Sequence, residues 1–213
     1  MKLINIIIPF FLFFFKPLLA LESIAKQAIV FDMQTNSIIY EKNADELMSP
    51  SSMSKLLTVY YVFKKIKNKE ISLKDKFKVS RNAWKKGGSR MFLDENSLVS
   101  IEDLLRGIIV QSGNDACITI AEGFSGTEKN FSIELNELAK EIGLENSIFT
   151  NSTGWPDPEH LTTTRDLLTL AIRTIKDFPD MYKFYAEKEF TYNKIRQINR
   201  NPLLFLDKNV DGL

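Results

Sequence analysis

The chain has 213 residues, of which 44% are apolar and 26% are charged, and this balance predicts one folded domain with a substantial core. Its 28 Lys and Arg face 27 Asp and Glu, and neither sign forms a long block. This even charge argues against a nucleic-acid partner, because such proteins concentrate basic residues on one surface. Cys117 is the only cysteine, which excludes an intrachain disulfide, and its apolar neighbours predict a buried helical thiol.

The amino-terminal segment differs from the rest of the chain. Lys2 precedes an almost unbroken apolar run over residues 3–15. This pattern predicts a secretory signal peptide over residues 1–20, cleaved near Ala20. The alternative is a transmembrane anchor, but an anchor needs roughly 20 apolar residues and the run is shorter. We therefore expect a near-neutral, exported domain over residues 21–213, in the periplasm or on the outer face of the cytoplasmic membrane.

The first elements of that domain follow from local periodicity. Residues 27–33 and 37–42 are rich in Ile, Val, Phe and Tyr and are separated by a polar tripeptide, which predicts a β-hairpin. Residues 52–67 carry apolar side chains at helical spacing and end in lysines. After the preceding Ser-Pro-Ser, this stretch predicts a helix with a capped start and a cationic end.

The later elements rest on capping and stop signals. Ser100 precedes an apolar-periodic stretch over residues 101–110 with two acidic residues in its first turn, as expected of a capped helix. Gly143 and Pro179 mark two helix ends. The remaining predictions are helices over residues 115–122, 128–142 and 164–176, a strand over 189–193, and an irregular tail over 199–213.

Histidine chemistry is almost excluded by composition. His160 is the only histidine, and it follows a Pro-Asp-Pro-Glu sequence. A Ser-His-Asp triad or a His/Cys metal site would depend on this one residue. We interpret it as a loop residue in water, and we expect neither a metal nor an organic cofactor. A serine nucleophile in this chain would therefore need a base other than histidine.

Lysine can be that base in a Ser-x-x-Lys motif, which Ser52 and Lys55 form. Residues three apart share one face of a helix, so the amine can meet the hydroxyl. Partial burial or a nearby cation lowers the pKa of a lysine and allows it to accept the proton. A helix N-terminus at Ser52 would also favour developing negative charge and contribute N–H groups to an oxyanion hole.

The motif alone is weak evidence, because Ser23 and Lys26 form it as well. Ser23 lies beside the predicted cleavage site and no helix pattern follows it. Ser52, in contrast, begins an amphipathic helix. We therefore assign the nucleophile to Ser52.

A Ser-x-Asn pattern also occurs twice, at Ser80 and at Ser112. Only Ser112 and Asn114 flank a glycine between two predicted helices. There the hydroxyl can relay a proton to a leaving amine, and the amide can bind a substrate carbonyl or Lys55. The alternative is that both residues only cap helices and turn the chain.

Ser-x-x-Lys followed by Ser-x-Asn resembles the active-site signature of penicillin-binding proteins and class A β-lactamases, whose third motif is Lys-Thr-Gly. Over nearly all of residues 25–213 the chain resembles the D-alanyl-D-alanine carboxypeptidases among the low-molecular-mass penicillin-binding proteins. The matching segments are residues 49–58 (SPSSMSKLLT), 90–93 (RMFL), 111–116 (QSGNDA), 163–166 (TTRD), 187–193 (EKEFTYN) and 209–213 (NVDGL).

This resemblance implies an α/β (α+β), β-lactamase/transpeptidase-like fold, with an antiparallel sheet and a helical subdomain. It implies that Ser52 attacks the bond between the terminal D-alanines of a peptidoglycan stem peptide and that Lys55 takes its proton. Ser112 then helps to protonate the departing D-alanine, and Asn114 binds substrate. β-Lactams are expected to acylate the same serine.

One departure concerns the end of the sequence. In the family, a Val-Asp-Gly-hydrophobic tetrapeptide leads directly into Lys-Thr-Gly, and this sequence stops at Leu213. We therefore expect a partial catalytic domain over residues 21–213, incomplete at its C-terminus, and a 213-residue product that is inactive or unstable. The family's C-terminal β-domain and amphipathic membrane anchor would follow beyond this point.

Three alternatives stay open. A D,D-endopeptidase shares all these motifs. A class A β-lactamase needs a deacylating Glu in a Glu-x-x-Leu-Asn pattern, whereas Glu134, Leu135 and Asn136 have the wrong spacing. A non-catalytic peptidoglycan-binding remnant is favoured only by the missing Lys-Thr-Gly motif.

Overall fold

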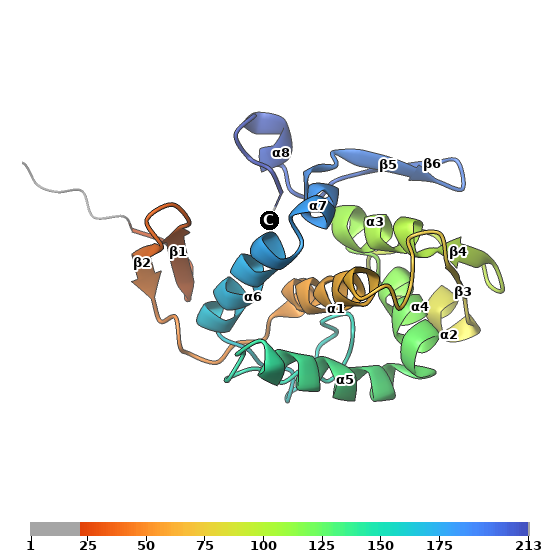
Figure 1. Ribbon diagram of the computed structural model, residues 1–213, viewed down its shortest axis with the longest axis horizontal. Coiled ribbons are helices and arrows are strands. Elements are labelled where there is room, and N and C mark those ends of the chain that lie inside the picture. The colour runs from red at the N-terminus through yellow and green to blue at the C-terminus, as the bar shows by residue number, and fades with distance from the viewer. Residues whose placement is uncertain (1–21, 213) are drawn as a thin grey trace, which may run out of the picture.

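The computed structural model describes residues 22–212, and the predicted signal peptide lies outside them. The described residues form a body of packed helices with three separate two-stranded antiparallel sheets at its periphery (Figure 1). Antiparallel pairing and a helical subdomain were both expected. No helix within residues 22–212 has the length and apolarity to cross a membrane.

The elements are as follows. The helices are α1 (Lys55–Lys67), α2 (Arg81–Lys85), α3 (Ile101–Gln111), α4 (Asn114–Ser125), α5 (Glu128–Glu141), α6 (Thr164–Asp177), α7 (Pro179–Tyr182) and α8 (Leu203–Leu206), with 3₁₀ turns η1 (Ser51–Ser54) and η2 (Lys183–Ala186). The strands are β1 (Ala28–Asp32), β2 (Ser37–Lys42), β3 (Lys76–Lys78), β4 (Leu98–Ser100), β5 (Glu189–Tyr192) and β6 (Ile195–Ile198).

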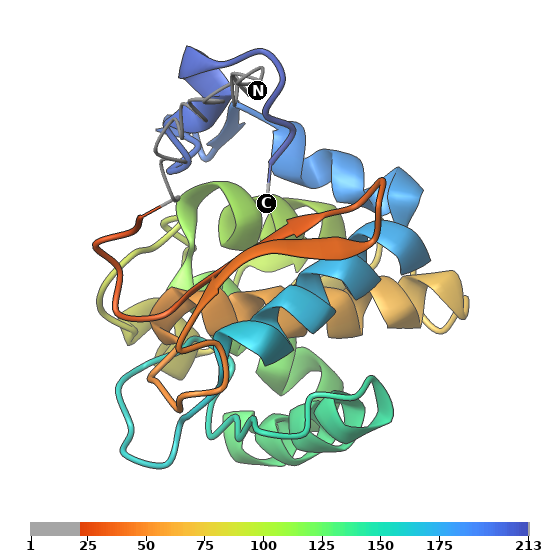
Figure 2. The ribbon, with the colours of Figure 1, turned by 90° about the vertical axis from the view of Figure 1, so that its left-hand side faces the viewer.

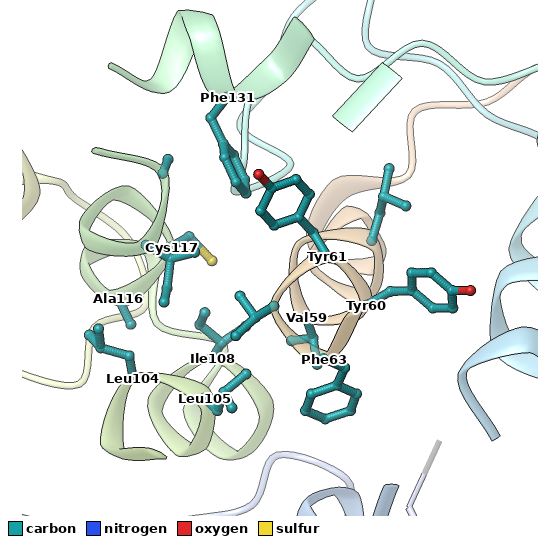
Figure 3. Packing of buried hydrophobic residues seen from close by; sticks show 14 of the residues in the cluster. Val59, Tyr60, Tyr61, Phe63, Leu104, Leu105, Ile108, Ala116, Cys117 and Phe131 are labelled. Carbon is teal, nitrogen blue, oxygen red and sulfur yellow. The ribbon is translucent and has the colours of Figure 1, made fainter. Parts of the chain in front are cut away.

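Helix α1 forms the centre of the core (Figure 3). It is buried along most of its first nine residues, on all sides, as expected of a helix surrounded by others. In Figure 3 its Val59 and Phe63 lie toward α3, and Tyr61 lies toward α5. The rings of Tyr61 and Phe131 meet edge to face with their centroids 4.9 Å apart, a favourable aromatic geometry. This packing fixes α1 within the helical body.

The predicted N-terminal hairpin is confirmed as β1 paired with β2. It lies against α6 on one side of the helical body (Figure 2). Arg165 of α6 forms ion pairs with Asp45, at 2.6 Å, and with Glu41, at 2.9 Å. These pairs join the hairpin and the chain that follows it to the start of α6.

The predicted helix ends are largely confirmed. The Ser100 hydroxyl accepts a hydrogen bond from the Asp103 amide and caps α3. Thr127 and Thr163 cap α5 and α6 in the same way. Gly143 follows α5 with a φ of +85°, a conformation that favours glycine. Helix α6 ends at Asp177, and Pro179 opens the short α7 instead of only closing α6.

The structure adds elements that local patterns did not predict. Strand β3 pairs with β4, twenty residues further along, and α2 lies between them. Strand β6 pairs with β5 across Asn193 and Lys194, which both have positive φ, as a tight hairpin turn requires. The tail over residues 199–213 is not fully irregular, since it contains the single turn of α8.

Candidate active site

The candidate nucleophile lies on a tight turn at the entrance to α1. Ser51 has a φ of +49° and opens the 3₁₀ turn η1, which leads directly into α1. Neither Pro50 nor Ser54 makes a side-chain cap, so the predicted capped start was wrong. The Ser54 hydroxyl donates instead to the Ser51 carbonyl, at 2.9 Å. The turn exposes Ser52 to solvent and buries Lys55 just behind it.

Lys55 is held beside Ser52, as helical spacing predicted. Its Nζ lies 3.1 Å from the Ser52 Oγ and 2.6 Å from the Thr153 carbonyl oxygen. The side chain is buried, and this burial lowers its pKa, with further lowering by the positive charges of Arg200 and Lys86. A lowered pKa enlarges the neutral fraction of an amine, which can then accept the hydroxyl proton.

A glycine that the sequence did not indicate holds this turn from outside. Gly154 has a φ of +76°, and a Cβ built there would lie 1.7 Å from the Ser51 carbonyl oxygen. The loop that contains Gly154 also supplies the Thr153 carbonyl to Lys55. Only a residue without a side chain allows this loop to lie so close to η1, the turn that carries Ser52.

The second motif lies on the turn between α3 and α4, as predicted. Ser112 adopts a left-handed conformation with a φ of +59°, and its Oγ is buried without a hydrogen-bond partner. The side-chain amide of Asn114 donates from its Nδ2 to the Gly87 carbonyl, at 2.9 Å. No hydrogen bond joins this side chain to Lys55. The Gly87-Gly88 pair, for which the sequence pattern indicated no role, therefore positions Asn114. A Cβ at Gly88 would lie 2.7 Å from the Asn114 Nδ2.

The segment over residues 89–93 fastens this turn to the body of the protein. The backbone N–H of Asn114 donates to the Ser89 carbonyl, at 2.7 Å. The buried carboxylate of Asp115 accepts from the amides of Met91, at 3.0 Å, and of Leu93, at 3.2 Å. These bonds give a structural role to the Arg-Met-Phe-Leu segment, whose function the sequence pattern alone did not indicate.

One cavity brings the candidate catalytic residues together. It has a volume of about 260 Å³ and is lined by Ser52, Lys55 and Ser112. Apolar side chains from α1, α3 and α6, together with Tyr185, form most of the remaining wall. Two motifs separated by nearly sixty residues therefore face one space, where a reacting group can meet both.

The interpretation of His160 as a loop residue in water was wrong. Its side chain is 1% exposed and lies beneath the nucleophile turn, with its Nε2 2.7 Å from the Ser54 Oγ. Burial lowers its pKa, an effect that Asp157 opposes. The ring of Phe149 packs on it edge to face, at 5.6 Å. The Pro-Asp-Pro-Glu sequence gave no sign that the loop folds back under η1.

The structure distinguishes the two copies of each motif, as expected. Ser23 and Lys26 lie outside any helix, and Lys26 is exposed. The Ser80 hydroxyl only caps α2, accepting from the Ala83 amide. Cys117 is buried as predicted, and burial raises the pKa of its thiol to about 12. No cluster of His, Cys, Asp and Glu suited to a metal occurs among the residues that the structure describes.

Comparison with solved structures defines the class. Penicillin-binding protein 5 from Haemophilus influenzae matches with a TM-score of 0.85 and 39% identity, over 89% of this chain and 56% of that one. Penicillin-binding protein D2 from Listeria monocytogenes, solved in an ampicillin-bound form, matches with a TM-score of 0.79 and 27% identity, over 89% of this chain and 77% of that one. The fold is that of the penicillin-binding proteins.

The family follows from sequence comparison. The model of the D-alanyl-D-alanine carboxypeptidase family matches residues 16–213. D-alanyl-D-alanine carboxypeptidase DacC from Escherichia coli is 40% identical over 196 residues, which cover 89% of this chain and 49% of that protein. This chain belongs to the D-alanyl-D-alanine carboxypeptidase family. It spans about half the length of the curated relatives it matches.

Proposed function

We propose that this chain carries the nucleophile-bearing part of a serine-type D-Ala-D-Ala carboxypeptidase, which removes the terminal D-alanine from peptidoglycan stem peptides. The observation that supports this most is the buried Lys55 amine, 3.1 Å from the exposed Ser52 hydroxyl. Residues 21–213 would form part of an exported catalytic domain, after cleavage of a signal peptide over residues 1–20.

The proposed reaction uses the residues of the cavity in sequence. Neutral Lys55 accepts the proton as the Ser52 Oγ attacks the carbonyl carbon of the penultimate D-alanine. The peptide bond then breaks, the Ser112 hydroxyl gives its proton to the leaving amine and takes one from protonated Lys55, and free D-alanine departs. Water hydrolyses the remaining ester and restores Ser52. The unpartnered Oγ of Ser112 suits this role, because no protein group competes for its proton.

Asn114 is proposed to bind substrate rather than to react. Its side chain is 7% exposed and is fixed by the Gly87 carbonyl, so it is already oriented before a peptide arrives. Preorganised amides favour binding because little side-chain entropy is lost when the substrate binds.

β-Lactams are proposed as covalent inhibitors of the same site. Their strained amide would react with Ser52 in the manner of the D-Ala-D-Ala bond, and the product would leave slowly. The related protein from Listeria monocytogenes, solved with ampicillin bound, makes this reagent class a suitable probe.

The test is labelling with a fluorescent penicillin, followed by mass spectrometry of the labelled peptide. We expect label on Ser52, and none after Ser52→Ala, in the 213-residue chain or in a version extended through a Lys-Thr-Gly strand. Absence of label in both forms would contradict the proposal and favour a non-catalytic peptidoglycan-binding protein.

Substrate preference needs a second assay. Release of D-alanine from a pentapeptide ending in D-Ala-D-Ala is expected, and it should exceed cleavage of a cross-linked peptide. The reverse preference would identify a D,D-endopeptidase, and rapid hydrolysis of the penicillin would identify a β-lactamase.

A further inference from the structure

His160 lies at the junction of the two segments that hold Ser52 and Lys55, and its hydrogen bonds define its protonation state. Two backbone groups define the orientation of the neighbouring Asn151 side-chain amide. Its Oδ1 accepts from the backbone amides of Thr153, at 3.1 Å, and of Trp155, at 2.9 Å. A backbone N–H is always a donor, so this atom is the oxygen and the Nδ2 is a donor.

Three groups face the Nδ1 of His160. The Thr150 amide N–H donates to it at 3.1 Å, the Thr150 Oγ1 lies 3.1 Å away, and the Asn151 Nδ2 lies 3.3 Å away. An imidazole nitrogen that accepts these bonds carries no proton. The single proton of the neutral ring then resides on Nε2, which donates to the Ser54 Oγ at 2.7 Å.

A second hydrogen bond connects Ser54 to the turn that carries Ser52. Since the Ser54 Oγ accepts from His160, its own proton is free to donate to the Ser51 carbonyl, at 2.9 Å. That carbonyl belongs to the peptide unit that joins Ser51 to Ser52. Gly154 lies against the same carbonyl. The imidazole thus fixes the backbone from which Ser52 projects.

The Nδ1 side reaches Lys55 by a second route. The Asn151 Nδ2 lies 3.3 Å from the His160 Nδ1, and the Asn151 Oδ1 accepts from both the amide and the hydroxyl of Thr153, at 3.1 and 2.9 Å. The Thr153 carbonyl in turn accepts from the Lys55 Nζ, at 2.6 Å. One buried ring is therefore linked to both partners of the candidate reaction.

We propose that neutral His160, with its proton on Nε2, is a positioning residue that sets the relative placement of Ser52 and Lys55 through Ser54 and Asn151. This rests on the proposed function, since it assigns His160 a role in the acylation of Ser52. The residue touches neither substrate nor the reacting atoms. Its effect should appear in the rate constant of acylation and not in the initial binding of the penicillin.

The variants follow from the geometry of the two ring nitrogens. His160→Gln keeps a donor near the position of Nε2, whereas His160→Ala removes every hydrogen bond of the ring. Ser54→Ala retains the imidazole and breaks only the link to Ser51. Stopped-flow measurements of the reaction with penicillin separate the acylation rate constant from the dissociation constant of the initial complex. They use the form of the protein that the fluorescent penicillin labels.

We expect His160→Ala and Ser54→Ala to lower the acylation rate constant by about 10- to 100-fold, as misplaced reacting groups do, with the dissociation constant unchanged. His160→Gln should recover most of the loss. The double variant should be no slower than the slower single variant, because both act on one chain of bonds.

Phe149→Leu is the matched control, because Phe149 packs on the ring without a side-chain hydrogen bond to it. It should lower the melting temperature and leave the acylation rate constant of folded protein unchanged. Wild-type acylation rates in folded His160→Ala and Ser54→Ala would overturn the inference. An unlabelled wild type would contradict the proposed function instead, so the two failures are distinguishable.

Discussion

The chemistry of Lys55 depends on its surroundings more than on its identity. An exposed lysine is almost fully protonated near neutral pH and cannot accept a proton. Burial and two neighbouring cations lower the pKa of Lys55 in this structure. We therefore expect acylation of Ser52 to accelerate as pH rises, because the neutral fraction of Lys55 increases. Rates of penicillin labelling across a pH series measure this, and a rate that does not change with pH would contradict it.

Lys55→Arg tests this role directly. Arginine keeps the positive charge but is never neutral in proteins, so acylation should fall by about 10²- to 10⁴-fold. The rate of penicillin labelling measures the loss. Lys26→Arg, in the second Ser-x-x-Lys motif, is the matched control and should label at the wild-type rate. Equal labelling of the two variants would exclude Lys55 as the base.

His160 should also make stability depend on pH. Its pKa is lowered in the folded state, so the unfolded chain, with a pKa near 6.5, binds the proton more tightly. The free energy of unfolding should therefore fall as pH drops below about 6.5, and level off below the folded-state pKa. Urea titrations across this range should show a smaller decline for His160→Gln than for wild type, and identical declines would argue against a buried neutral imidazole.

At the scale of elements, the site depends on how closely the 151–154 loop approaches η1. Gly154→Ala places a methyl group against the Ser51 carbonyl and adds backbone strain. Gly143 has a similar φ of +85° but open space around it, so Gly143→Ala reports the backbone strain alone, about 1–2 kcal/mol. We expect Gly154→Ala to cost more stability and to abolish labelling, as measured by urea unfolding and penicillin labelling. Equal losses would mean that the loop can move aside.

Local signals predicted most elements because each was encoded within a few residues. The Ile-rich runs of β1 and β2, the Ser100 cap and Gly143 all act on their own neighbours. Strand β3 is only three residues long and is defined by its pairing with β4. No local periodicity can report such a pairing, and the same holds for the 3₁₀ start of α1.

At the scale of the whole molecule, core packing around α1 stabilises the fold. Phe131 is fully buried against Tyr61, and Phe131→Ala should lower the free energy of unfolding by about 3–5 kcal/mol. Calorimetry or urea unfolding measures this loss. The acylation rate constant at low temperature should change little, because no hydrogen bond of Ser52 or Lys55 involves this ring. A loss of acylation rate in parallel with the loss of stability would show that core packing itself places Lys55.

The amino-acid sequence by itself determined the candidate reactive groups. Ser52, Lys55, Ser112 and Asn114 could be predicted because spacing along one helix, or across one turn, is a local property. The single histidine of the chain also pointed to lysine as the base, since a serine nucleophile needs a proton acceptor and composition left few others.

The tertiary structure decided how those groups are held. Gly154, Gly87 and His160 reach the site from segments roughly thirty to a hundred residues away from the residues they contact. Their roles arise from close approach, burial and hydrogen bonds to backbone carbonyls, none of which leaves a periodic signal in the chain. His160 in particular reads as a solvated loop residue until the fold places it beneath Ser54.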